Sequence, residues 1–182
     1  MIRRLPLPEG FGQLYACAAG ETEAEQHEAA YAMLQAVLCS GYGIPALPEI
    51  SRTELGKPSF PAYPALHFSI SHTRGLAVVL LSDRTCGVDT ERRRPLREKV
   101  AARVFSSGEQ AALQAAEDPD MLFTRLWTLK EAYVKAIGIG VSYPMRELSF
   151  SLTDDGVQSN RADADFFHLI EGEYAVSVCI LK

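Results

Sequence analysis

Asp89 and Glu91 are two acidic residues whose spacing suggests chemistry. They lie two residues apart in a segment expected to be a strand, so both carboxylates project from the same face. Neighbouring carboxylates raise each other's pKa unless a cation lies between them, and oxygen ligands of this kind suit Mg²⁺. The pair therefore predicts a magnesium site. A solvated strand edge paired with the arginines at 92–94 is the alternative.

A second polar group lies farther along the chain at helical spacing. Trp127, Glu131 and Lys135 follow one another at i, i+4 and i+8, which places them along one stripe of a helix. An exposed glutamate–lysine pair, worth only about 0.3–0.5 kcal/mol, is the more common explanation of such spacing. Spacing alone leaves open whether this stripe is such an exposed pair or part of a functional site.

Three further residues have a structural explanation beside a functional one. His72 ends an alternating segment, where a hydrogen-bonded histidine is common, and Lys57 in a Gly-Lys-Pro loop is commonly just exposed. Ser106 and Glu109 have the spacing of a capping box, in which each side chain bonds the other's backbone amide at a helix start. Glu109 is therefore either a helix cap or a candidate general base.

Strand and helix patterns follow one another in an order that indicates an α+β fold. The first half contains a strand over 11–18, a helix over 21–38, and antiparallel strands over 66–71 and 76–81. The second half contains a strand over 86–91, helices over 98–105, 108–116 and 119–137, and strands over 148–152, 166–170 and 174–181. This order predicts two pseudo-symmetric lobes, 1–84 and 85–182, each an antiparallel sheet packed on helices. A ligand cleft is expected between them.

Composition restricts the class of protein. With 47% hydrophobic and 23% charged residues in 182, the chain is globular, and its net charge of -5 argues against a nucleic-acid partner. Its four cysteines are scattered without metal-binding spacing, which is typical of free thiols in a reducing cytoplasm. The apolar run 76–81 is far shorter than a membrane span. We expect a cytoplasmic monomer that binds neither nucleic acid nor membrane.

Four motifs, taken in order, resemble the signature of 4′-phosphopantetheinyl transferases. Residues 87–91, Gly-Val-Asp-Thr-Glu, match the G-[IV]-D-x-E element of that family. Residues 127–135, Trp-Thr-Leu-Lys-Glu-Ala-Tyr-Val-Lys, match W-x-x-K-E-[AS]-x-x-K. Upstream, Gly-Lys-Pro at 56–58 and Phe-Ser-Ile-Ser-His at 68–72 match two further motifs. The two-lobe length is similar to the surfactin-synthetase-activating (Sfp-like) type.

The resemblance implies an enzyme that moves 4′-phosphopantetheine from coenzyme A to a serine of an acyl or peptidyl carrier protein and releases 3′,5′-ADP. It implies Mg²⁺ held by Asp89, Glu91 and Glu131, with Lys135 offsetting phosphate charge. Glu109 matches the spacing of the family's proposed general base. The residues that it places against coenzyme A are Lys57, Ser71, His72, Lys130 and Lys135. The basic residues between Arg92 and Arg103 are candidates for docking an acidic carrier protein.

The region of the first expected helix departs from the family pattern. Members usually carry basic residues there that grip the 3′-phosphate of coenzyme A, whereas residues 21–28 read Glu-Thr-Glu-Ala-Glu-Gln-His-Glu. Arg3, Arg4 and Arg52 are the candidate substitutes. Two other functions stay open. One is a Mg²⁺-dependent hydrolase of a nucleotide pyrophosphate, and the other is a relative that binds carrier protein or coenzyme A without turnover.

Overall fold

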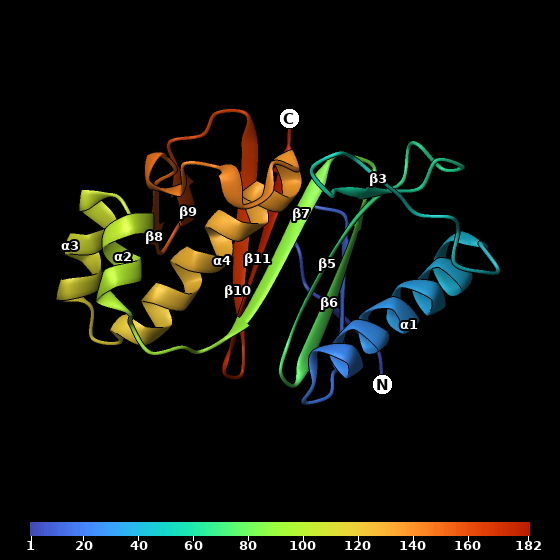
Figure 1. Ribbon diagram of the computed structural model, residues 1–182, viewed down its shortest axis with the longest axis horizontal. Helices are drawn as coiled ribbons and strands as arrows, with labels where there is room; N and C mark the ends of the chain where they lie inside the picture. The colour runs from blue at the N-terminus through green and yellow to red at the C-terminus, as the bar shows by residue number, and fades with distance from the viewer.

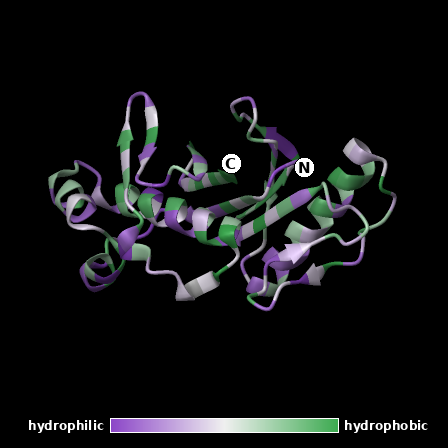
Figure 2. Ribbon diagram, turned by 90° about the horizontal axis from the view of Figure 1, so that it is seen from above, coloured by the Kyte–Doolittle hydropathy of each residue, from purple (hydrophilic) through white to green (hydrophobic). Residues whose placement is uncertain are grey.

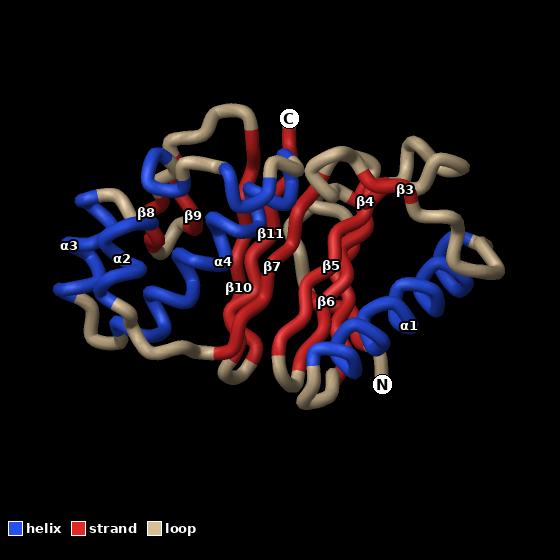
Figure 3. Tube along the Cα trace, in the orientation of Figure 1, coloured by secondary structure: helices blue, strands red, loops and turns tan.

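Two antiparallel sheets lie at the centre of the molecule, and helices cover their outer sides (Figures 1 and 3). The computed structural model describes residues 1–182, apart from the side chain of Val141. Helix α1 lies on one side of the pair of sheets, and α2, α3 and α4 lie on the other. The layers therefore run helix, sheet, sheet, helix.

The first sheet belongs to the N-terminal part of the chain. Its strands are β1 (Arg3–Leu5), β2 (Gln13–Ala18), β5 (His67–Thr73) and β6 (Leu76–Ser82), in the order β1-β2-β6-β5. Helix α1 (Glu23–Tyr42) packs on it, starting at a Thr22 capping box and ending at Gly43 in the left-handed conformation. The loop that follows holds a small antiparallel pair, β3 (Ser51–Arg52) and β4 (Pro58–Ser59).

The second sheet belongs to the C-terminal part. Its strands are β7 (Cys86–Arg92), β10 (Ala164–Glu171) and β11 (Tyr174–Leu181), in the order β10-β11-β7. Helix α4 (Pro119–Ile137) packs on this sheet, with Asp118 as N-cap and Gly138 in the left-handed conformation at its end. The outer elements are α2 (Glu98–Val104), α3 (Ser107–Ala115), the hairpin β8 (Phe150–Thr153) and β9 (Gly156–Ser159), and 3₁₀ turns at Gly140–Ser142 and Met145–Glu147.

Three hydrophobic clusters hold these layers together. One lies between α1 and the first sheet, and a second lies between α4 and the second sheet. The third lies between the sheets, where Val78 and Leu80 from β6 meet Val88 from β7 and Val178 from β11. All seven residues of β6 are buried, because both faces of this strand are covered. In Figure 2, green hydrophobic bands alternate with paler or purple bands along the helices and strands.

Helix α4 and strand β7 pack at very close range. A Cβ atom added to Gly87 would lie 2.0 Å from the carbonyl oxygen of Ala132 and 2.5 Å from the amide nitrogen of Ala136. Only glycine permits this approach, which a side chain would prevent. The close packing places the acidic face of β7 beside the stripe of α4 that carries Glu131 and Lys135.

The predicted α+β architecture with two sheet-and-helix lobes is confirmed, and all four cysteines of the described structure are free. The boundary at residue 84 stays a prediction. The polar face of strand β5 is covered, since Ser69 and Ser71 are only 6% and 5% exposed where β5 packs beside β7. Among the described residues, none of the helices has the length and apolarity needed to cross a bilayer.

Candidate active site

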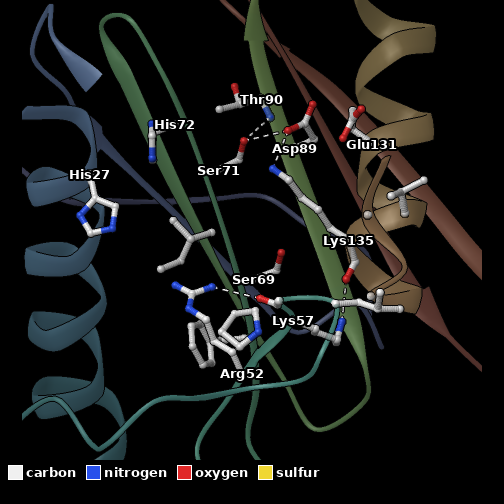
Figure 4. Close-up of a pocket in the computed structure, with 18 of the residues that line it drawn as sticks. His27, Arg52, Lys57, Ser69, Ser71, His72, Asp89, Thr90, Glu131 and Lys135 are labelled. Atoms are coloured by element: carbon white, nitrogen blue, oxygen red, sulfur yellow. Dashed lines mark hydrogen bonds and ion pairs between the residues drawn. The ribbon is translucent and has the colours of Figure 1, made fainter. Parts of the chain in front are cut away.

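A cavity of about 570 Å³ draws its walls from both lobes (Figure 4). Its lining side chains come from α1, the loop around β3 and β4, β5, β7 and α4. The polar residues that line it include His27, Tyr31, Arg52, Lys57, Ser71, His72, Asp89, Glu91, Glu131 and Lys135. Seven of the predicted site residues therefore line one cavity: Lys57, Ser71, His72, Asp89, Glu91, Glu131 and Lys135.

Three carboxylates lie at the side of the cavity formed by β7 and α4. Asp89 is buried, and Glu91 and Glu131 are partly buried. Burial raises the pKa of Glu131 to about 7, and the negative charges of Asp89 and Glu91 act in the same direction. Burial also raises the pKa of Glu91, which the guanidinium of Arg94 opposes. The cluster is therefore a region where added positive charge would be stabilising.

Asp89 has one occupied oxygen and one free oxygen. Its Oδ1 accepts hydrogen bonds from the Ser71 hydroxyl at 2.8 Å and the Lys135 ammonium at 2.7 Å (Figure 4). Its Oδ2 is buried and has no hydrogen-bond partner in the described part of the chain. A buried carboxylate oxygen without a partner is costly, so it marks a place for a cation.

The donor set fits Mg²⁺ in atom type and charge, since all three groups are carboxylates. The three carboxylates are not yet arranged for metal binding. Among the described residues, no group of three His, Cys, Asp or Glu side chains is placed to hold a metal ion. Instead, Lys135 bonds Asp89, and Arg94 lies 2.9 Å from Glu91. These two cations balance Asp89 and Glu91, whereas Glu131 forms no ion pair among the described residues.

The other side of the cavity carries His27 and Tyr31 from α1 together with Arg52 from β3. The Arg52 guanidinium donates to the Tyr31 hydroxyl at 3.1 Å and to the Gly56 carbonyl at 3.0 Å. The rings of His27 and Tyr31 lie 4.4 Å apart. His72 faces this group, and its pKa is lowered by burial and by the nearby His27 and Lys135. This side therefore offers one permanent cation, Arg52, and several side chains that can form hydrogen bonds.

The family model of the 4′-phosphopantetheinyl transferase superfamily matches residues 85–179, which are 95 of the 182 residues. The chain belongs to the 4′-phosphopantetheinyl transferase superfamily. The match contains Asp89, Glu91, Glu131 and Lys135, so the carboxylate side of the cavity lies inside the region that defines membership.

Relatives named 4′-phosphopantetheinyl transferase are similar over part of their length. One from Bacillus subtilis is 36% identical over 128 residues, covering 68% of this chain and 57% of its own. AcpT from Salmonella typhimurium is 40% identical over 97 residues, covering 50% of each chain. A Bacillus anthracis holo-(acyl-carrier-protein) synthase structure in complex with CoA (3′,5′-ADP) is 18% identical, covers 53% of this chain and 94% of its own, and gives a TM-score of 0.47. The chain spans about half the length of the curated relatives it matches.

Glu109 and Lys130 lie outside this cavity, and their side chains are buried against each other. Glu109 forms the capping box, with Oε2 accepting from the Ser106 amide at 2.7 Å, and its Oε1 accepts from the Phe150 amide at 3.0 Å. The Lys130 ammonium is 3.0 Å from Glu109 and also donates to the carbonyls of Met145 and Leu148. This placement gives no support to a general base at 109 or a coenzyme A contact at 130, because Lys130 spends its three protons on Glu109, Met145 and Leu148, and Glu109 accepts from Ser106, Phe150 and Lys130.

Lys57 lines the cavity but directs its amine elsewhere. The Nζ atom donates to the carbonyls of Cys86 at 3.1 Å, Lys135 at 2.7 Å and Ala136 at 2.6 Å. Burial lowers the pKa of this amine. Three carbonyls use all three ammonium protons, and the last two belong to the final turn of α4, where a cation is favoured. The amine of Lys57 therefore ties β7 to the end of α4, and its expected contact with the nucleotide stays a prediction.

The basic run after β7 is partly neutralised. Arg92 pairs with Glu173, Arg93 with Asp118, and Arg94 with Glu91. The part of the run that remains for a partner is Arg97, Lys99 and Arg103.

Sequence reasoning missed His27 and Tyr31 in the cavity. Their signal was the i, i+4 aromatic spacing within an otherwise acidic helix start.

Proposed function

We propose that this chain transfers the 4′-phosphopantetheine group from coenzyme A to a serine of an acyl or peptidyl carrier protein, with release of 3′,5′-ADP. The observation that carries the proposal is the convergence of Asp89, Glu91, Glu131 and Lys135 on one cavity between the lobes. Membership of the superfamily supports the same reaction. The curated relatives bear the corresponding name.

Asp89, Glu91 and Glu131 would hold Mg²⁺, and the unpartnered Oδ2 of Asp89 supports this assignment. When bound, the ion would neutralise charge on the diphosphate of coenzyme A. Lys135 already bonds Asp89, so its ammonium is placed to offset charge on a phosphate beside these carboxylates. Arg52 and His72 line the same cavity and would contact the nucleotide.

In the proposed reaction, the serine oxygen forms a bond to the β-phosphorus of coenzyme A. The bond from that phosphorus to the oxygen of the departing 3′,5′-ADP breaks, and its electron pair leaves with the nucleotide. Lys135 offsets the negative charge that develops there. The serine proton passes to a group or a water in the cavity, since Glu109 is buried outside it.

The partners of this proposal are coenzyme A and a carrier protein that is acidic around its serine. Arg97, Lys99 and Arg103 are the cations placed to steer such a surface. We also propose a cytoplasmic monomer that binds neither nucleic acid nor membrane, in keeping with a net charge of -5.

Intact-mass analysis of an apo carrier protein incubated with coenzyme A, Mg²⁺ and this chain tests the proposal. The expected result is addition of one phosphopantetheine group, with a rate about 10²–10³-fold lower for Asp89→Asn. Asp154→Asn, at an exposed turn, is the matched control and should transfer normally. Release of 3′,5′-ADP without addition to the carrier protein would indicate a hydrolase. Coenzyme A binding with neither product would indicate a relative without turnover.

A further inference from the structure

Strands β5 and β7 lie side by side, each at the edge of its own sheet. In the part of the chain that the structure describes, serine hydroxyls join them in place of a backbone ladder. Ser69 Oγ accepts from the Val88 amide at 3.0 Å, and Ser71 Oγ accepts from the Thr90 amide at 3.1 Å. The spacing of two residues on both strands matches, because side chains at i and i+2 project from one face. We call these two contacts the serine seam.

The two serines differ in what they do with their own protons. A hydroxyl has one proton to donate. At Ser71 that proton goes to Oδ1 of Asp89, at 2.8 Å. Ser69 makes no hydrogen bond to a carboxylate among the described residues. The seam therefore contains one hydroxyl that reaches the carboxylate site and one matched hydroxyl that does not.

Both ends of the Ser71 contact are fixed. The hydroxyl oxygen is held by a backbone amide of β7, and Ser71 and Asp89 are only 5% and 6% exposed. Because Lys135 shares Oδ1 at 2.7 Å, both bonds to Asp89 fall on one oxygen. The other oxygen, Oδ2, is left without a partner in the described structure.

We infer that Ser71 is a positioning residue that holds the Asp89 carboxylate with one oxygen bonded and the other free for a divalent cation. The inference rests on the proposed function, because it gives Asp89 the role of a metal ligand. It is separate from the expected contact of Ser71 with coenzyme A, which stays a prediction. Partners that orient a ligating carboxylate typically change metal affinity by about 10–100-fold when removed.

The test is direct binding of Mn²⁺, measured by the loss of the electron paramagnetic resonance signal of the free ion, without coenzyme A or carrier protein. Mn²⁺ prefers the same carboxylate ligands as Mg²⁺. Ser71→Ala should raise the Kd for Mn²⁺ by about 10-fold or more, while Ser69→Ala leaves it within about twofold. Ser71→Thr keeps the hydroxyl and should restore binding. Both alanine variants should lower the melting temperature, because each removes one contact of the serine seam.

Equal Mn²⁺ affinity in Ser71→Ala and Ser69→Ala would overturn the inference, whatever the melting temperatures. If Ser71→Ala does not fold, Ser71→Cys replaces it, since a thiol has similar size and is a weak donor. Unchanged Mn²⁺ affinity in Ser71→Cys would then overturn the inference. Failure of the proposed function is a separate result. It would show as an unmodified carrier protein, whatever the Mn²⁺ affinities of the wild-type chain and the serine variants.

Discussion

The ammonium nitrogen of Lys130 lies 3.0 Å from a carboxylate oxygen of Glu109, and the two side chains are 0% and 1% exposed. The pair connects the start of α3 to the middle of α4, and through the Phe150 amide it also holds the start of β8. Burial lowers the pKa of Lys130, and the charge of Glu109 opposes that shift. The pair is thus a structural joint behind the helix that carries Glu131 and Lys135.

Breaking this pair should destabilise the protein without altering the chemistry. Glu109→Gln leaves the capping geometry available but leaves a buried lysine unbalanced, so the free energy of unfolding should fall by about 3–5 kcal/mol in urea titration. Glu25→Gln is the matched control, because Glu25 forms the same kind of capping box on α1 at an exposed site. It should cost about 1 kcal/mol or less. A Glu109→Gln protein that keeps its stability and loses turnover would restore the general-base role.

Gly87→Ala should separate α4 from β7. The new Cβ would overlap the backbone of Ala132 and Ala136, and forcing extra volume into a packed site typically costs about 1–3 kcal/mol. We expect a lower melting temperature and weaker Mn²⁺ binding, since the carboxylates belong to both elements. Gly108→Ala is the control. It lies in α3 with no atom within 4 Å of an added Cβ, so its stability should stay the same or rise.

Arg52 should decide how strongly the 3′-phosphate of coenzyme A is recognised. It is a cation of the cavity wall that faces no carboxylate partner among the described residues, while the start of α1 is acidic. Arg52→Ala should raise the KM for coenzyme A about tenfold, the loss of one charge-assisted hydrogen bond. The KM for 3′-dephospho-coenzyme A should hardly change. Arg84→Ala, which removes an arginine bonded to the Gly10 carbonyl, is the control, and an equal rise in both KM values would refute the assignment.

His168 should make the fold sensitive to mild acid. Burial, and then the charge of Arg125 whose nitrogen lies 2.7 Å from Nε2, lowers the pKa of His168 to about 4. The unfolded chain therefore binds a proton more readily than the folded one, so stability is lost as the pH falls from about 6.5 towards 4. His168→Gln should reduce the fall in melting temperature between pH 7 and pH 5. His67→Gln is the comparison, and an equal reduction there would argue against a specific effect of His168.

Local signals account for the elements that were predicted well. The predicted and observed bounds of α4 agree because residues that begin and end helices mark both ends: Asp118 before Pro119 at the start, and Gly138 at the end. Helix α1 continues to Tyr42, beyond the predicted end at Leu38, because Gly43 takes the left-handed conformation that ends it. The sequence has two glycines close together at this end of the helix, and it does not show which of them ends the helix.

Contacts between distant segments account for what the sequence did not show. The capping role of Glu109 was visible from Ser106, but its partner Lys130 comes from another helix. Likewise, the polar face of β5 looks like a solvent-facing one until β7 covers it. Motif order predicted that four side chains would share one cavity: Asp89, Glu91, Glu131 and Lys135. The pairing of Lys135 with Asp89 required the structure.

The cavity has one wall on each lobe, and the serine seam is a narrow polar joint between those walls. A ligand that contacts Arg52 on one side and Lys135 on the other would bind both lobes and bridge this joint. Its binding would stabilise the folded state in which both walls are in place, so saturation should shift the thermal transition upward.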